Sequence, residues 1–163
     1  MVTATGVARR PLEAAVWAAL AEVPDPEIPT VSVLDLGVVR AVDASVERIR
    51  VEILPTFIGC PAVDAMRRAI EARLAGHAAD VEVVVSLAEP WTTERITPLG
   101  RERLRSSGFG PPPVNAELPV VGVACPFCGS LRTTLENLFG PTLCRSIYHC
   151  AECRQPFEQF KEV

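Results

Sequence analysis

The sequence has 163 residues, of which 48% are hydrophobic and 22% are charged, and its formal net charge is −4. This length allows one ordinary domain plus a small appendage, and the apolar content can fill a core. The acidic balance argues against a general nucleic-acid-binding protein. No apolar run has the length of a membrane span, and residues 1–10 lack the hydrophobic core of a signal peptide. We therefore expect a cytoplasmic protein without nucleic-acid or membrane partners.

The first predicted element is a helix at residues 11–22, which is rich in Ala and Leu and follows a loose start at residues 1–9. A stiff, extended turn comes next, at residues 24–29, because each of its prolines restricts the backbone of the residue before it. This turn carries two carboxylates, those of Asp25 and Glu27. The simplest interpretation is that Asp25 caps the turn and that Glu27 is solvated.

Two strands follow, at residues 38–42 and 49–54, with a plausible hairpin turn at residues 43–45 between them. The second strand alternates apolar side chains with Arg50 and Glu52. This alternation predicts that one face of the strand is buried and that the other faces water.

A helix is predicted from Pro61, because proline is favoured at the first helical position. Four of its apolar residues recur on one face: Val63, Met66, Ile70 and Leu74. Residues 80–87 alternate well enough to form a third strand. The order helix, strand, strand, helix, strand predicts a small α/β (α+β) sandwich, with helices packed on a three- or four-stranded sheet.

Cys60 lies between the second predicted strand and the second predicted helix. Pro55 ends the strand because it has no N–H to give, and Gly59 lets the loop turn sharply. The free N–H groups and the macrodipole at a helix N-terminus favour a thiolate, which a reactive or metal-binding thiol needs. The alternative is that Cys60 is a small buried residue that fills a tight turn.

Residues 98–107 are predicted to form a short charged helix, and Gly108–Pro113 to end all regular structure. A Gly/Pro cluster of this density is typical of a linker. We therefore predict an α/β domain at residues 10–107, a linker at residues 108–119 and a small module at residues 120–163.

The small module holds two C-x-x-C pairs: Cys125 with Cys128, and Cys150 with Cys153. Disulfides are disfavoured in a reducing cytosol, whereas two such pairs joined by a hairpin supply the four thiolates of a tetrahedral zinc site. A closed four-cysteine site has no open coordination position, so we expect the zinc to be structural. Ligand type alone leaves a rubredoxin-like iron site or a cluster as competing identities.

The module is also too short to form a sufficient hydrophobic core without a cross-link, so a structural metal is expected on physical grounds. Strands are predicted at residues 132–139 and 143–148, around a Gly140–Pro141 turn. Cys144 is interpreted as a plain strand residue, with a substitute ligand or a partner contact as alternatives. His149 is interpreted as a surface neighbour of the site rather than as a ligand.

Three motifs in order resemble the iron–sulfur cluster assembly family, first catalogued as domain of unknown function 59. They are residues 25–29 (Asp-Pro-Glu-Ile-Pro), residues 35–37 (Asp-Leu-Gly), and Pro55–Thr56 with Gly59–Pro61. The four-cysteine module, with Glu-Pro-Trp-Thr at residues 89–92 before it, is similar to a narrower group, the D subunits of bacterial phenylacetyl-CoA epoxidase systems. The resemblance covers nearly the whole chain.

This resemblance implies an accessory role in aerobic phenylacetate degradation rather than catalysis. The expected partners are an oxygenase subunit with a di-iron centre and a reductase subunit with flavin and a [2Fe–2S] cluster. A member of this narrower group is expected to help install or maintain a metal centre. The cysteine and acidic positions of the family correspond here to Cys60, Asp25 and Glu27, with Asp35 as a further acidic position.

A single thiolate is expected to hold iron or a cluster only transiently, because a stable cluster usually has four thiolate ligands. Two protomers of a homodimer, or one protomer and a client, could share it, and Asp25 or Glu27 could supply an oxygen ligand or polarise the thiol. One alternative is a docking subunit in which Cys60 is inert. The other is an enzyme with Cys60 as nucleophile, which lacks a base: His77 is at the far end of a helix that spans roughly 20 Å, and His149 is in the separate module.

Overall fold

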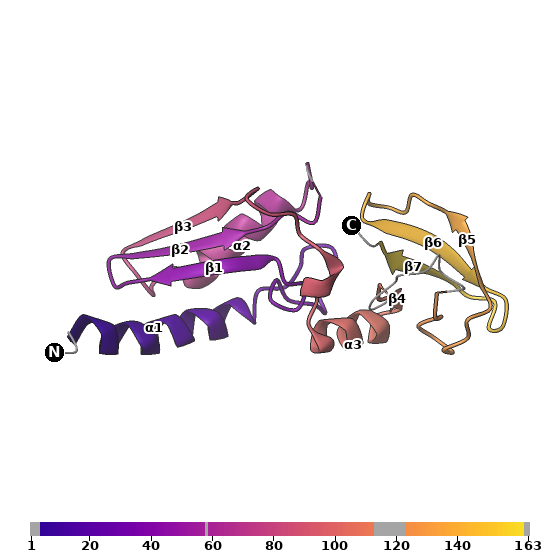
Figure 1. The fold of residues 1–163 in the computed structure, drawn as a ribbon, viewed down its shortest axis with the longest axis horizontal. Coiled ribbons are helices and arrows are strands. Elements are labelled where there is room, and N and C mark those ends of the chain that lie inside the picture. The colour runs from indigo at the N-terminus through magenta and orange to yellow at the C-terminus, as the bar shows by residue number, and fades with distance from the viewer. Residues whose placement is uncertain (1–3, 58, 113–122, 162–163) are drawn as a thin grey trace. The chain divides into compact units, whose positions relative to one another are not determined.

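The chain divides into two compact units, Met1–Trp91 and Thr92–Val163, called here the N-terminal and the C-terminal unit. Figure 1 shows both in a computed structural model, which describes residues 4–57, 59–112 and 123–161. Among these described residues, no helix combines the length and the apolar character needed to cross a membrane.

The N-terminal unit contains α1 (Ala4–Leu20), β1 (Val39–Ala44), β2 (Arg48–Ile53), α2 (Val63–Leu74) and β3 (Asp80–Val85). The three strands form one sheet in the order β1-β2-β3. Strands β1 and β2 are an antiparallel hairpin, whereas β2 and β3 are parallel and are connected through α2. The predicted α/β sandwich is confirmed, because each predicted helix and strand of this unit is present in the predicted order.

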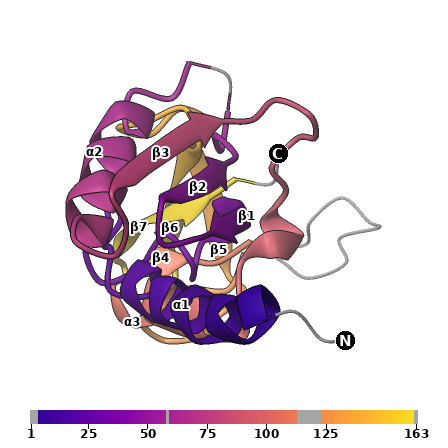
Figure 2. The same ribbon diagram turned by 90° about the vertical axis from the view of Figure 1, so that its left-hand side faces the viewer.

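The core of this unit lies between the sheet and its helices. On β2, the side chains of Ile49, Val51 and Ile53 are fully buried. Helix α2 contacts β3, and α1 contacts both α2 and β1, as Figure 2 also shows. The helices contribute buried apolar residues at helical spacing: Val16 and Leu20 from α1, and Met66, Ile70 and Leu74 from α2.

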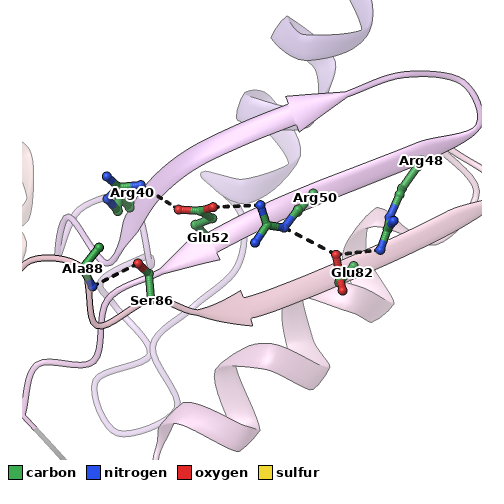
Figure 3. Close-up of polar contacts among 7 residues, drawn as sticks. All are labelled: Arg40, Arg48, Arg50, Glu52, Glu82, Ser86 and Ala88. Carbon is green, nitrogen blue, oxygen red and sulfur yellow. Dashed lines mark hydrogen bonds and ion pairs between the residues drawn. The ribbon is translucent and has the colours of Figure 1, made fainter.

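The other face of the sheet carries a ladder of alternating charges (Figure 3). Arg40 contacts Glu52 at 2.7 Å, Glu52 contacts Arg50 at 3.0 Å, and Glu82 contacts both Arg50 and Arg48, at 3.5 and 2.7 Å. Exposed ion pairs of this kind contribute about 0–1 kcal/mol each. The ladder therefore marks the wet face that the alternation of β2 predicts, and contributes little to stability.

Helix α1 begins earlier than predicted, at Ala4 rather than at Pro11. The prediction took Pro11 as the first helical residue. A proline inside a helix removes one backbone hydrogen bond and its ring crowds the carbonyl group four residues earlier, but the residues before Pro11 include Ala and Arg, which are good helix formers.

The C-terminal unit contains a short 3₁₀ helix (Thr93–Arg95), α3 (Pro98–Ser106), β4 (Phe109–Gly110), β5 (Thr133–Asn137), β6 (Arg145–Cys150) and β7 (Pro156–Phe160). Its four-stranded sheet has the order β4-β7-β6-β5. Strands β5, β6 and β7 are antiparallel neighbours, and β4 is parallel to β7. We call residues 123–161 the ribbon.

Two strands of this sheet were not predicted. Strand β7 follows the second C-x-x-C pair, and β4 lies within the predicted linker at residues 108–119. Phe109 and Gly110 pair with β7 instead of only spacing two domains. Residues 113–119 of that linker lie outside the described residues, and the predicted bounds 10–107 and 120–163 stay predictions.

Candidate metal centre and thiol site

The two C-x-x-C pairs form two turns of the same geometry. In the first, the N–H of Gly129 donates to the carbonyl oxygen of Cys125 at 2.9 Å; in the second, the N–H of Arg154 donates to that of Cys150 at 2.8 Å. Both donors have a positive φ, 73° for Gly129 and 59° for Arg154. The sequence shows this requirement only in the first turn, where glycine adopts a left-handed conformation without strain.

The four predicted cysteines come together at one point. Their Sγ atoms all lie within 4.8 Å of one another. The Cys125–Cys153 and Cys128–Cys150 pairs are each 3.6 Å apart. A tetrahedral zinc ion with Zn–S bonds of about 2.3 Å requires sulfur–sulfur distances of about 3.8 Å. The four sulfurs therefore fit a tetrahedral metal ion of that size.

Cys150 and Cys153 differ in how readily they lose a proton. The backbone N–H of Cys153 points at the sulfur of Cys150, and this donor, against burial, lowers the pKa of Cys150 to about 6. The pKa of Cys153 is raised to about 12: the N–H of Gln155 acts to lower it, but burial and the neighbouring thiols, including Cys125, outweigh that donor. A bound cation replaces the remaining protons, because thiolates are the metal ligands.

The apolar core beside these sulfurs is small. It consists of Val123, Cys125, Cys150 and Phe157, with Tyr148 packed against it and stacked on Phe157 at a ring distance of 5.7 Å. Half of this core is therefore cysteine ligands. A core of this size does not hold a module of this length without a metal or a disulfide, and the cysteines are free.

Cys144 and His149 lie outside the group of four. Cys144 is buried just before β6, with its sulfur 3.2 Å from the hydroxyl of Thr142. His149 is half-buried on β6 and pairs with Thr134 of β5. Within the described residues, the four cysteines are the group of His, Cys, Asp and Glu side chains close enough to hold one metal ion.

Cys60 lies in the turn between β2 and α2 and is half-buried. Gly59 has a φ of 85°, which explains the glycine before it. Helix α2 begins at Val63, two residues later than the predicted start at Pro61. The N–H of Val63 donates to the carbonyl oxygen of Cys60 at 3.3 Å, so Cys60 precedes the helix by one turn of chain.

Thr56 contacts Cys60 and was not singled out from the sequence as a site residue. Its hydroxyl, on a residue that is 8% exposed, donates to the sulfur of Cys60 at 3.9 Å. The signal that could have found it is its position four residues before the cysteine in a turn fixed by Pro55 and Gly59. A neutral hydrogen bond of this kind contributes about 0.5–1.5 kcal/mol.

The predicted acidic residues have local roles. Asp25 is buried, and one of its oxygens accepts the N–H groups of Glu27 and Ile28 at 2.9 and 2.8 Å, so it caps the proline-rich turn. Asp35 exchanges side-chain–backbone hydrogen bonds with Ser32. Glu27 is exposed. Within the described residues, none of these acids joins Cys60 in a group of three or more ligands, so their role beside Cys60 stays a prediction.

Comparison with known proteins bears on both halves of the chain. Residues 13–85 match a family model described as "Iron-sulfur cluster assembly protein", and residues 110–161 match one described as "PaaD zinc beta ribbon domain". Over 150 residues, the chain is 44% identical to an Escherichia coli (strain K12) protein named as the D subunit of a "Putative 1,2-phenylacetyl-CoA epoxidase", and 90% of each chain is covered. This chain belongs to the same family. The predicted membership of the iron–sulfur cluster assembly family, and of its narrower epoxidase group, is confirmed.

One solved structure agrees with the N-terminal part of the fold. A Bacillus anthracis protein described as domain of unknown function DUF59 is 26% identical with a TM-score of 0.57, over 61% of this chain and 96% of its own. A conserved hypothetical protein from Thermotoga maritima is 28% identical over 55% of this chain and 89% of its own, with a TM-score of 0.46. The fold is thus an assembly-family domain followed by a four-cysteine, metal-binding module of the zinc-ribbon type.

Proposed function

We propose that this protein is an accessory subunit of a phenylacetyl-CoA epoxidase system, in which it assembles or maintains the iron–sulfur or di-iron centre of the oxygenase. The observation that carries the proposal is the joint match: a relative named as the D subunit of that epoxidase covers 90% of the chain, and the N-terminal half of the chain matches an iron–sulfur cluster assembly model. The oxygenase and reductase subunits are the proposed partners, catalysis takes place in them, and the system is cytoplasmic.

Cys60 is the residue proposed to carry the metal cargo. It is half-buried rather than enclosed, it sits before α2, and the hydroxyl of Thr56 donates to its sulfur. One thiolate does not retain a cluster that usually takes four. In the proposed mechanism Cys60 therefore holds iron or a cluster in transit, and a second protomer or the client supplies the other ligands.

Asp25 and Glu27, the two acids of the motif at residues 25–29, have different proposed roles. Asp25 uses one oxygen to cap its turn, so it positions the loop that carries Glu27. Glu27, which is exposed, is the proposed oxygen ligand for the cargo. The four cysteines of the ribbon are proposed to hold one structural zinc ion: Cys125, Cys128, Cys150 and Cys153.

The proposal is tested by support of the oxygenase. Cys60→Ser changes one atom at a loop position and should leave the fold intact, but oxygenase activity in cells should be lost. Cys144→Ser is the matched control, because it makes the same change at a thiol outside both sites and should keep full activity. Full oxygenase activity with Cys60→Ser would rule out the transfer mechanism.

A second candidate function is a docking subunit without cluster transfer, and one observation favours it. The ribbon exposes six large apolar side chains, each between 48% and 61% accessible: Phe127, Leu131, Leu135, Leu138, Phe139 and Leu143. Exposed apolar residues gathered in one module are typical of protein interfaces. This function predicts that Phe139→Ser abolishes co-purification with the oxygenase, while Cys60→Ser has no effect on oxygenase activity.

A further inference from the structure

Strand β4 joins the ribbon from a distant part of the sequence. Phe109 pairs with Glu158 and Gly110 with Gln159, in parallel to β7. Helix α3 ends only three residues before β4, so the pairing also fixes the end of the helix. Two residues form too short a strand to be stable by backbone hydrogen bonds alone, and other contacts must hold it.

Aromatic rings beside the metal ligands make the first of these contacts. A Cβ atom on Gly110 would lie 3.1 Å from the ring of Phe157, which belongs to the core of the four cysteines. A Cβ atom on Gly108 would lie 3.2 Å from the ring of Phe127, which stands between Cys125 and Cys128 in the first C-x-x-C turn. The backbone of residues 108–110 is therefore pressed against side chains that the metal site positions.

A buried cation makes the second contact. Arg145 of β6 is 6% exposed, its guanidinium lies 5.2 Å from the centre of the Phe109 ring, and it pairs with Glu158 at 2.8 Å. Phe109 and Glu158 are also partners in the β4–β7 register. A partly desolvated cation–π contact is stronger than an exposed one, and this one holds the Phe109 ring on the ribbon.

Residues 93–112, the segment before the ribbon, are also held together by one side chain. The guanidinium of Arg101 in α3 donates to the carbonyl oxygens of Thr93 and of Pro112, at the two ends of this segment. We therefore expect this segment to dock on the ribbon as one rigid element. Between them lies a groove of about 550 Å³, lined by Ser107 and Phe109 of the segment and by Phe127 and Ile147 of the ribbon.

Neither helix α3 nor the ribbon is expected to stay folded on its own. A nine-residue helix such as α3 is marginal in isolation. The apolar cluster beside the metal ligands of the ribbon has four residues, two of them ligands, and in small metal-binding modules folding is coupled to metal binding. We propose that the metal at the four cysteines also holds α3 and β4, so that Thr92–Val163 is one metal-dependent unit and the groove exists only in the metal-loaded protein. This inference rests on the structural zinc proposed above for the four cysteines, and not on the proposed role in the epoxidase system.

The test is amide hydrogen exchange on the full chain, with zinc bound and after zinc is removed by a chelator. In the zinc-bound protein, α3 and β4 should be protected together with β6 and β7. Removal of zinc should speed exchange in α3 by about tenfold or more, because its protection comes from a shared opening. Helix α2, in the other unit, is the internal reference and should not change. Protection of α3 that survives zinc removal would overturn the inference.

A pair of variants separates docking from metal binding. Phe109→Ala removes the ring beside Arg145 and leaves every cysteine in place, so the variant should keep one zinc per chain while exchange in α3 becomes several times faster. Leu99→Ala is the matched control on the same helix, because Leu99 is 54% exposed, and it should leave exchange unchanged. If Phe109→Ala keeps zinc and leaves α3 as protected as in the parent, α3 does not depend on the ribbon.

Discussion

The sulfur atoms of Cys125 and Cys153 lie 3.6 Å apart, although 28 residues separate them in the sequence. This contact closes the ribbon, because one cysteine comes from the first C-x-x-C turn and the other from the second. The same arrangement brings Cys128 to Cys150 at 3.6 Å. Four thiols at such distances, beside a small apolar cluster that is half cysteine, fit a metal ion with the proposed structural role.

Loss of a ligand should therefore unfold the ribbon. Structural zinc in zinc-finger peptides binds with about 10–16 kcal/mol of apparent free energy, which is also folding energy. Cys150→Ala should abolish the zinc content and the near-ultraviolet circular dichroism of the ribbon, while the N-terminal unit keeps its own thermal transition. Cys144→Ser is the control and should retain one zinc per chain. A Cys150→Ala protein with an ordered ribbon would show that the metal is dispensable.

Zinc binding should weaken as the pH falls. The folded pKa of Cys150 is lowered from 9.0 to about 6, so its thiolate stabilises the folded site fully above pH 9 and this contribution is lost as pH falls through about 6. Zinc should remain bound at pH 7 and be released only on acidification below about pH 6, where protons compete for the sulfur. A colorimetric zinc indicator follows the release, and complete release already at pH 8 would contradict this assignment.

Thr56 should affect how fast Cys60 reacts. Thr56→Val keeps the shape of the side chain and removes the hydroxyl that donates to the sulfur at 3.9 Å. A hydrogen bond of about 0.5–1.5 kcal/mol corresponds to a change of about two- to tenfold, so alkylation of Cys60 by iodoacetamide should slow by that factor. Thr56→Ser retains the donor and should react at the parental rate. Equal rates for all three proteins would mean that the contact has no chemical effect.

Asp25 allows its capping role to be separated from a ligand role. Asp25→Ala removes the acceptor of two backbone N–H groups, one of them buried, and should lower the free energy of unfolding by about 1–3 kcal/mol in a denaturant titration. Asp25→Asn keeps an acceptor oxygen and should be close to the parent in stability and in support of the oxygenase. If Asp25→Asn is stable but fails to support the oxygenase, the carboxylate acts on the cargo and not only on the turn.

Part of the fold could be predicted because local pattern decides it. The alternation of β2 predicts its buried and wet faces, since a pleated strand turns successive side chains to opposite sides. The two C-x-x-C pairs predict the metal centre, because the spacing itself forms the turn. Both features need only neighbouring residues.

Other features depend on contacts that no local pattern reveals. Strand β4 exists because Gly110 can approach Phe157, a residue 47 positions later that belongs to the core of the metal site. A Gly-Phe-Gly-Pro sequence looks like a linker until that partner is known. The hydrogen bond from Thr56 to Cys60 likewise depends on the path of the loop, and the start of α2 on which residues close its first turn.

Cys60 is proposed to carry iron or a cluster in transit, while the ribbon holds a separate zinc ion. The most direct measurement is the zinc, iron and sulfide content, with a visible absorption spectrum, of anaerobically purified protein beside its Cys60→Ser variant. We predict one zinc per chain in both proteins and iron only in the parent. One zinc in both and no iron in either, even after cluster reconstitution, would contradict the claim and favour the docking subunit.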